Sequence, residues 1–560
     1  MYMLKLPYGI SNYEELVQDR YYYADKTSYI EKLENLPEKR IMFLRPRKFG
    51  KTLFTSTLEN YYDIKKADKF ENLFGNTYIG KHPTELKNSY HILKFNFSGI
   101  NTKNEETTMK GFKERVAIPI QGFVQKYNLD FYVNWDLTAE GLLSSLIETF
   151  KTQRPEEKIY VIIDEYDHFA NELLSFNTSQ FKTLLSKNGK VRKWYEILKE
   201  GTESVIDRIF ITGVAPITLD SLTSGFNIGS DKTQNAKFNE MMGFTKEELI
   251  QMMEDIGIEK KEQEELLPIM KENYDGYKFS VDATEKLYNS NMCLFFLNSY
   301  IDREKIPEKL IDTNIASDYN KLGNMLDLCV GEERARIIEE TIAGEGIVSE
   351  ITEKFNPAIE FEEKELVSML FYLGYLTIAG EEIGTTVLKV PNKVMRELYS
   401  EYFMKLLSIE TDLKITNEYT EIRRGIALEG KIDKIIEIME EFLKRLSNRD
   451  YIKFDEKNIK IMFYTISSSV SGYVVKSEME VERKYPDILL IPKDRDKGYK
   501  SIMIEFKYLK KDEENKLQEK QGEARKQIEE YAELEEIKEI QNLYKYTVVA
   551  VNDRLYVEEI

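Results

Sequence analysis

The chain has 560 residues, too many for a single hydrophobic core, so we expect two to four domains. Its composition of 42% apolar, 32% charged and 12% aromatic residues is that of a folded protein and excludes a largely disordered chain. The formal net charge of −19 excludes a protein that is basic over its whole surface, so any contact with nucleic acid must be local.

At the N-terminal end, residues 1–9 lack the apolar core of a signal peptide, and no later run is long enough to span a membrane. The two cysteines, Cys293 and Cys329, stand in unrelated surroundings, which supports neither a disulfide framework nor a zinc site. We therefore expect a cytoplasmic protein without a membrane segment.

Residues 1–285 alternate apolar runs with amphipathic helical stretches. Four of the runs are candidates for buried strands: Ile41–Leu44, Ile92–Phe97, Ile159–Ile163 and Arg208–Gly213. Strands separated by long helices are typical of a parallel α/β sheet, and we expect this stretch to form the first domain.

A phosphate-binding loop is predicted directly after the first of these strands. Residues 45–52 read Arg-Pro-Arg-Lys-Phe-Gly-Lys-Thr and precede a helix at Leu53–Tyr61, so that Arg45 stands where such a loop usually has its first glycine. Gly50 allows close approach of the backbone, and the loop amides face phosphate oxygens. Lys51 is expected to reach the β- and γ-phosphates and Thr52 to ligate Mg²⁺. The predicted nucleotide contacts are therefore Arg45, Pro46, Arg47, Lys48, Phe49, Gly50, Lys51 and Thr52.

Two acids end the third of the predicted strands. Asp164 and Glu165 follow Ile159–Ile163, which places Asp164 to hold the metal through water and Glu165 to polarise an attacking water as general base. Acids also follow strands as helix caps, which is the structural alternative. Thr212 lies near the end of the next strand, where a polar residue can sense a γ-phosphate or simply belong to the strand.

Residues 286–410 are mainly helical in pattern and are predicted to form a middle region. A helix at Glu365–Leu373 precedes the strand-like Tyr375–Ala379, a turn, the strand Thr385–Val390 and a further helix. Helix, β-wing and helix resemble a winged-helix module, and an α+β lid would give the same pattern.

Residues 411–560 are predicted to form a third domain, with an amphipathic helix at Lys431–Asn448 near its start. In chain order its last hundred residues predict the helix Glu456–Val470, the strands Tyr473–Ser477, Asp487–Ile491 and Ser501–Lys507, the helix Glu519–Leu534 and the strand Tyr546–Val551. Polar residues at 494–498 predict a hairpin turn between the second and third strands.

Three residues of this hairpin form a candidate metal site. Glu505 and Lys507 are two apart on one strand and share a face, while Asp487 begins the partner strand. The two carboxylates can hold Mg²⁺ or Mn²⁺, and the lysine can orient a water or steady the charge that develops on a phosphodiester. A structural ion pair between Lys507 and Asp487 across the two strands would produce the same sequence pattern.

Six short stretches of the chain point to a known family: Tyr23–Thr27, Arg45–Thr52, Asp164–Asp167, Phe244–Glu248, Tyr274–Phe279 and Leu287–Asn289. Together they resemble the AAA-ATPase-like family, which is bacterial. The resemblance implies an AAA-type P-loop NTPase in which Arg45 is the family's own version of the loop. It also implies a place near the nucleotide for Asp25 and Lys26, although Asp25 could equally cap the helix that follows.

Members of that family typically carry a C-terminal domain of the PD-(D/E)xK nuclease superfamily. The C-terminal elements match its restriction-endonuclease-like αβββαβ core, with the three residues of the candidate metal site on its motif positions. Gln527 and Tyr531, one helical turn apart, resemble the extra motif by which RecB-like nucleases contact DNA near the metal. The helix Glu456–Val470 lacks a histidine, and Tyr485-Pro486 replaces a Gly-Arg pair, two departures from many members.

These observations predict a protein that binds and hydrolyses ATP and carries a metal-dependent DNA nuclease domain, acting on mobile or foreign DNA. The expected ligands are ATP, Mg²⁺ or Mn²⁺, and DNA, with Lys510, Gln527 and Tyr531 as DNA contacts. One alternative is a nucleotide-regulated switch or scaffold whose nuclease-like fold binds DNA or protein without cutting. Another is a remodelling ATPase with a C-terminal adaptor. The choice between DNA and RNA, and assembly into a homo-oligomer, stay open.

Overall fold

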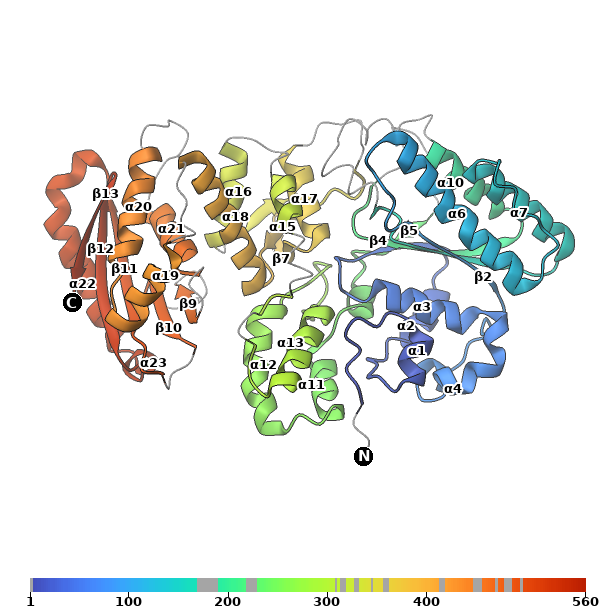
Figure 1. Cartoon of the computed structure of the whole chain (residues 1–560), viewed down its shortest axis with the longest axis horizontal. Helices are drawn as coiled ribbons and strands as arrows, with labels where there is room; N and C mark the ends of the chain where they lie inside the picture. The colour runs from blue at the N-terminus through green and yellow to red at the C-terminus, as the bar shows by residue number, and fades with distance from the viewer. Residues whose placement is uncertain are drawn as a thin grey trace. The chain divides into compact units, whose positions relative to one another are not determined.

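The computed structural model describes residues 4–168, 190–217, 229–307, 310–312, 319–326, 332–343, 346–355, 362–411, 418–446, 456–468, 472–477, 486–493 and 497–560 (Figure 1). The chain forms two compact units, one of residues 1–328 with 348–392 and one of residues 329–347 with 393–560. The expected domain limits at residues 285 and 410 rest on sequence texture alone and stay predictions. Within the described ranges, no helix combines the length and apolarity that a membrane span requires.

The first unit is built on a five-stranded sheet in which every strand pair is parallel. In sheet order its strands are β2 (His91–Asn96), β3 (Ile159–Asp164), β4 (Ile206–Gly213), β1 (Arg40–Leu44) and β5 (Ser230–Asp231). The four apolar runs each form one of these strands, which confirms the predicted parallel α/β sheet. Since the carboxyl ends of parallel strands meet at one edge, the residues that follow β1, β3 and β4 come together there.

Helices cover both faces of this sheet. Figure 1 shows α3 (Lys51–Tyr62) on one face and α6 (Glu105–Tyr127), α7 (Ala139–Gln153) and α10 (Lys190–Gly201) on the other. On the second face the buried ring of Trp194 meets the rings of Phe95, Phe97 and Phe112 edge-on, with centroids 5.1, 5.5 and 5.8 Å away. Aromatic burial of this kind stabilises the layer well beyond what the same area of small side chains provides.

The unit continues into helices and a small hairpin. Its other helices include α1 (Tyr13–Gln18), α2 (Ser28–Glu34), α4 (Phe70–Phe74), α5 (Tyr78–Lys81), α11 (Lys246–Asp255), α12 (Lys260–Tyr274), α13 (Ser290–Arg303), α15 (Tyr319–Leu326) and α17 (Glu363–Leu373). The predicted wing is the antiparallel pair β7 (Thr377–Glu382) and β8 (Thr385–Lys389). The helix that follows it, α18 (Lys393–Thr411), belongs to the second unit, so a winged-helix module stays a prediction.

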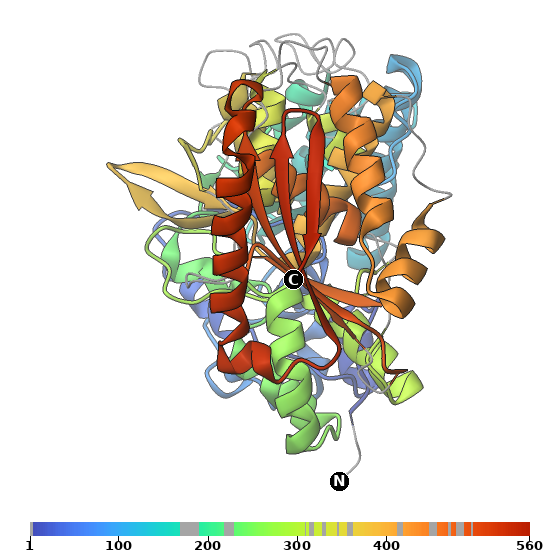
Figure 2. The same ribbon diagram turned by 90° about the vertical axis from the view of Figure 1, so that its left-hand side faces the viewer.

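The second unit contains a mixed five-stranded sheet, seen in red and orange in Figure 2. Its order is β13 (Arg554–Glu559), β12 (Leu543–Val551), β11 (Ser501–Leu509), β10 (Ile488–Pro492) and β9 (Tyr473–Ser477), and β11 and β12 are its parallel pair. The surrounding helices include α16 (Glu332–Ala343), α18, α19 (Tyr419–Arg424), α20 (Asp433–Leu446), α21 (Glu456–Ser468), α22 (Leu517–Ala532) and α23 (Glu535–Lys538). The order α21, β9, β10, β11, α22, β12 confirms the expected αβββαβ arrangement.

Two details of this sheet matter for the site. Ile528 of α22 packs on Leu489 and Met503, so α22 covers the sheet face that carries the odd-numbered residues of β11. Strand β13 was not predicted, although Asn552-Asp553 is turn chemistry and Asn552 has a positive φ of 56°.

Candidate functional sites

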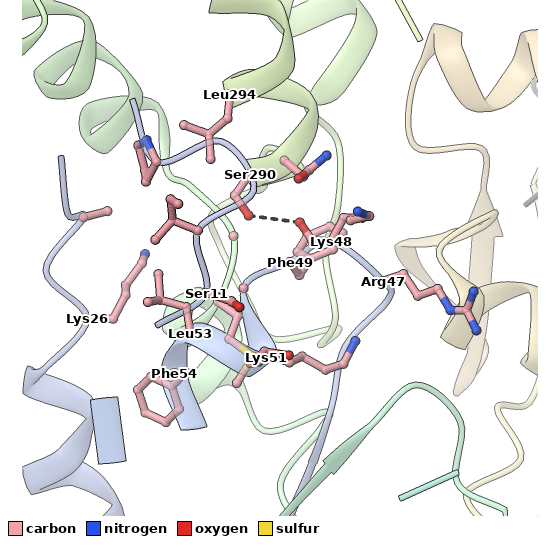
Figure 3. A pocket seen from close by; sticks show the side chains of 18 of the residues that line it. Ser11, Lys26, Arg47, Lys48, Phe49, Lys51, Leu53, Phe54, Ser290 and Leu294 are labelled. Atoms are coloured by element: carbon pink, nitrogen blue, oxygen red, sulfur yellow. Dashed lines mark hydrogen bonds between the residues drawn. The ribbon is translucent and has the colours of Figure 1, made fainter. Parts of the chain in front are cut away.

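A cavity of about 500 Å³ opens at the carboxyl edge of the first sheet. Its walls come from the predicted loop, the N-terminal segment, the ends of β2 and β3, and the start of α13. Figure 3 shows Arg47, Lys48 and the ammonium of Lys51 on one side, and Leu53 and Leu294 on the other. The cavity is thus cationic beside the loop and mainly apolar on the other side, where Lys26, paired with Glu248, is a charged exception.

The loop has the backbone of an anion site. Gly50 is the N-cap of α3 with a positive φ of 93°, and Lys48 has a φ of 69°, so both lie in the left-handed region. Amides in such turns point inward together, and the helix N-terminus adds positive potential. The buried ammonium of Lys51 donates to the carbonyls of Arg45 and Pro46, at 3.0 and 3.1 Å.

Arg45 does not line this cavity. Its guanidinium is buried and donates to the carbonyls of Leu44, Thr233, Phe238 and Asn239 at 2.9–3.3 Å. It also lies 4.1 Å from the ring centroids of Phe43 and of Phe279. Burial lowers the pKa of Arg45 to about 9. We therefore propose that its side chain anchors the loop and that only its carbonyl, through Lys51, takes part in the site.

Segments far downstream hold the loop from behind. The Lys48 carbonyl accepts from Ser290 Oγ at 3.1 Å, drawn as the dashed line in Figure 3, and the Phe49 carbonyl accepts from the Gly243 amide at 3.1 Å. The Phe49 ring meets Tyr277 and Phe279 edge-on, with centroids 4.9 and 5.5 Å away. The loop is therefore not a free turn between β1 and α3.

The same downstream segments are tied to the small hairpin. A Cβ added to Gly374, at the end of α17, would lie 2.8 Å from Cβ of Pro46, so only glycine lets these backbones approach. Lys278 donates its amide to Thr377 Oγ1 at 2.7 Å and accepts from the Ile378 amide at 3.2 Å. The hairpin and the phosphate-binding loop therefore share one packed wall.

The two acids after β3 take different environments. Asp164 is fully buried, its Oδ2 accepts from Asn96 Nδ2 at 3.4 Å, and its Oδ1 has no hydrogen-bond partner. Burial, then the charge of Glu165, raises the pKa of Asp164, and the Thr52 hydroxyl lowers it. Glu165 lines the cavity 3.9 Å from Lys51 Nζ and has a positive φ of 53°. A non-glycine residue in this region is strained, which is common at functional sites.

The residues after these acids fasten β3 to β4. The carboxylate of Asp167 accepts from the amides of Val214 and Ala215, at 3.0 and 2.6 Å, and burial raises its pKa to about 6. Thr212, just before Gly213, is fully buried, and its hydroxyl has no hydrogen-bond partner. It does not line the cavity. The strand ends that carry Asp164 and Thr212 are therefore held in fixed register.

Asp25 and Lys26 form structural bonds next to the cavity. Asp25 accepts from the amide and hydroxyl of Thr27, at 2.9 and 2.6 Å, and from the Tyr78 amide at 2.6 Å. Lys26 lines the cavity while its ammonium pairs with Glu248 at 2.6 Å. These bonds tie Asp25 to Thr27, the N-cap residue of α2, and to Tyr78, the first residue of α5, and the role of Asp25 toward the nucleotide stays a prediction.

Sequence reasoning missed several residues that line the cavity. Asn96 lies at the end of β2, opposite Asp164. A polar residue within an otherwise apolar strand is a signal that could have marked it as a candidate site residue. His168, just after Asp167, also lines the cavity. The apolar end is contributed by residues such as Pro7, Ile10 and Leu294, which carry no motif.

In the second unit, the hairpin of β10 and β11 brings Asp487, Glu505 and Lys507 together. The Phe506 amide donates to Asp487 Oδ2 at 2.6 Å, and Lys507 Nζ lies 2.8 Å from Glu505 Oε1. Both carboxylates are 2% exposed, and Glu505 Oε2 has no hydrogen-bond partner. Burial, then the charge of Glu505, raises the pKa of Asp487, and burial raises that of Glu505. The two carboxylates therefore lie close together on one side of the sheet.

A further lysine reaches this site from α21. Lys460 Nζ lies 2.6 Å from Asp487 Oδ1 and 2.9 Å from Glu456 Oε1, one turn earlier on the helix. The sequence did not single out either residue, because an acid and a lysine four apart on a helix usually form an exposed pair.

The predicted DNA contacts lie on and before α22. Gln527 is half-buried with Oε1 unpartnered, and Tyr531 packs against the cluster of Leu489 and Met503. Lys510 is exposed before α22. Residues 494–496 of the predicted turn lie outside the described residues.

Buried carboxylate oxygens without a hydrogen-bond partner show whether the two sites could hold a metal ion. Across the part of the chain that the structure describes, no three His, Cys, Asp or Glu side chains gather as a complete metal site. Mg²⁺ does not need one, since it keeps several waters and binds one or two carboxylates together with phosphate. Asp164 Oδ1 beside Thr52, and Glu505 Oε2 beside Asp487, fit that requirement.

The two regions that contain these sites match known families. Residues 7–223 match the family described as Predicted AAA-ATPase, and residues 454–560 match the PD-(D/E)XK nuclease superfamily, which confirms the two resemblances read from the sequence. The chain is also 22% identical over 411 residues to a protein of Azotobacter chroococcum mcd 1 described as "Uncharacterized protein in vnfD 5'region". That similarity covers 71% of this chain and 69% of the relative.

Proposed function

We propose that this chain, which joins an AAA-ATPase-like region to a PD-(D/E)XK nuclease-like region, binds and hydrolyses ATP and cleaves DNA with a divalent metal ion. The ATPase part of the proposal rests on the environment of Asp164. A fully buried carboxylate with an unpartnered oxygen is unfavourable unless a cation or a water completes it. It stands beside Thr52 and near Lys51, at the edge where a nucleotide would bind.

Each residue of the first site has a distinct task in this proposal. The amides at Gly50 and Lys51 receive phosphate oxygens, and the Lys51 ammonium neutralises them. Thr52 and Asp164 would hold Mg²⁺, which supplies charge neutralisation when bound. Glu165 orients and polarises the attacking water, and its strained backbone aims its carboxylate into the cavity.

The acids available to the cavity, rather than its apolar packing, favour adenine over guanine. Guanine presents N–H donors along one edge, and proteins usually pair them with a carboxylate. Glu165 is the one acid among the described lining residues, and it lies at the cationic end beside Lys51. The other end offers side chains such as Ile10, Leu53 and Leu294, which can pack on a purine face.

In the second site, Asp487 and Glu505 would hold the divalent ion, which supplies Lewis acidity and an activated water when bound. Lys507 is placed to steady the charge that develops on the phosphodiester, and it now neutralises Glu505 at 2.8 Å. Action on mobile or foreign DNA is part of this proposal and rests on the pairing of the two regions.

Two pairs of variants test the two activities separately. Lys51→Ala is expected to abolish ATP binding, while Glu165→Gln keeps binding and stops turnover. Normal hydrolysis by Lys51→Ala would refute the ATPase assignment. With Mn²⁺ and a plasmid, the parent protein is expected to cut, and Asp487→Ala and Lys507→Ala are expected not to.

One observation favours a second candidate, a nucleotide-regulated scaffold whose nuclease-like fold binds without cutting. Both carboxylates of the second site are already paired with lysines, Asp487 with Lys460 and Glu505 with Lys507. A plasmid that stays intact while the protein retains it in a gel-shift assay would favour this candidate.

A further inference from the structure

Lys460 lies against one of the two carboxylates of the second site. It is 16% exposed and its ammonium lies 2.6 Å from Asp487 Oδ1, closer than an ordinary ion pair requires. Asp487 Oδ2 is taken by the Phe506 amide at 2.6 Å. Both oxygens of this carboxylate are therefore engaged by groups of the chain itself.

The charges of the cluster show what the lysine changes. The carboxylates of Glu456, Asp487 and Glu505 and the ammonium groups of Lys460 and Lys507 leave one net negative charge. Without Lys460 the cluster would carry two. Because a divalent cation is drawn by the local charge, the lysine weakens its binding and also competes for Asp487 Oδ1.

Glu456 gives the ammonium a second place to go. It lies one helical turn before Lys460, at 2.9 Å, and its side chain is 37% exposed while that of Asp487 is 2% exposed. A lysine that leaves Asp487 can therefore keep an ion pair at the mouth of the site. A lysine side chain has the rotatable bonds for this movement, and its charge remains compensated.

We propose that Lys460 is an internal competitor of the divalent cation: its ammonium holds Asp487 in the metal-free site and moves to Glu456 when the metal enters. This inference rests on the proposed metal site of the nuclease-like region. It adds a residue outside the Asp487, Glu505 and Lys507 set, and it assigns Glu456 a role through Lys460. The site thereby responds to metal only above a threshold that the lysine sets.

The test measures Mn²⁺ affinity on the full chain without substrate or nucleotide, by calorimetry and by electron paramagnetic resonance of free Mn²⁺, and assigns to the second site the binding that Asp487→Ala removes. Lys460→Met keeps the length of the side chain and removes the charge, so we expect binding about tenfold tighter. Lys460→Arg keeps the charge and is expected to show no such gain. Lys444→Met is the control, since it removes the same charge from an exposed lysine that forms an i,i+4 pair with Glu440 on α20.

A double-mutant cycle separates a moving lysine from general electrostatics. Glu456→Gln is expected to weaken Mn²⁺ binding in the parent and to have a smaller effect in the K460M background, because the receiving carboxylate then has no ammonium to accept. The metal-free K460M protein is expected to melt at a lower temperature than the parent, because Asp487 loses its counter-ion, and to gain more from Mn²⁺.

The outcomes distinguish this inference from the function it rests on. If Asp487→Ala removes Mn²⁺ binding but K460M binds no tighter than the parent, the competitor role is wrong and the metal site stands. If neither the parent nor K460M binds Mn²⁺ at millimolar concentration, both proposals are wrong.

Discussion

Replacing Arg45 by methionine separates a structural arginine from a phosphate-binding one. The guanidinium makes four hydrogen bonds to buried carbonyls and lies between two aromatic rings. Arg47, two residues on, lines the cavity instead. Replacing Arg45 is therefore expected to lower stability, whereas replacing Arg47 is expected to weaken nucleotide binding.

The magnitude follows from what Arg45→Met leaves behind. Hydrogen bonds from a charged donor contribute about 1.5–3 kcal/mol each, offset by the cost of burying the charge, which is visible in the pKa lowered to about 9. Removing the donor leaves carbonyls unpaired in the core, and breaking a buried charged network costs about 3–5 kcal/mol. We expect a loss of about 3–5 kcal/mol in unfolding free energy, with ATP affinity of the folded protein changed less than about threefold.

Tryptophan fluorescence suits this measurement, because both tryptophans, Trp135 and Trp194, belong to the first unit. Urea unfolding followed in this way gives the stability of Arg45→Met, and titration with a fluorescent ATP analogue gives its affinity. Arg47→Met is the matched control, with a stability change below about 1 kcal/mol and weaker nucleotide binding. An Arg45→Met protein of unchanged stability that has lost ATP binding would refute the reasoning.

Three further predictions concern the strand ends around the first site. Gly213→Ala places a Cβ 2.2 Å from Asp167 Oδ1, so we expect a loss of about 1–3 kcal/mol in urea unfolding, and a loss below about 0.5 kcal/mol would contradict the packing. The pKa of Asp167 is about 6 in the folded protein against 3.8, so the folded state binds this proton more tightly, and stability rises by about 3 kcal/mol as pH falls from about 7 to about 3. Asp167→Asn should remove that part of the pH dependence, and equal pH profiles for the two proteins would show that the carboxyl is not the cause. Glu165→Gly is expected to be about 1 kcal/mol more stable than Glu165→Ala, because only glycine adopts a φ of 53° without strain, while neither variant hydrolyses ATP; calorimetric melting that ranks them equally would contradict the strain.

The sequence predicted the structure correctly where a local pattern of residues is compatible with only one local structure. The apolar runs became β1 to β4, and the glycine before Lys51 took the positive φ that the loop needs. The strand β13 shows a missed signal of the same kind, since Asn552-Asp553 is a usual hairpin turn. Local chemistry decides such features, so a single sequence carries them.

Features that depend on distant partners could not be read in this way. The guanidinium of Arg45 bonds Thr233, which is 188 residues away along the chain, and nothing in the loop itself indicates this. Lys460 and Glu456 have the spacing of an exposed helical pair, and only the packing of α21 on the sheet turns the lysine toward Asp487. The strand order β2-β3-β4-β1-β5 likewise arises from pairing between strands, and no single strand sequence encodes it.

The wall behind the phosphate-binding loop has a consequence for how this chain matures. Gly243, Ser290 and Gly374 all follow the loop in the sequence, and the last two lie well past residue 223, where the match to the AAA-ATPase family ends. A chain that emerges from the ribosome contains the whole loop sequence early. The residues that pack against the loop are all present only after residue 374 has been synthesised. We therefore expect nascent chains and shorter fragments to capture ATP poorly, even when their own sheet has formed.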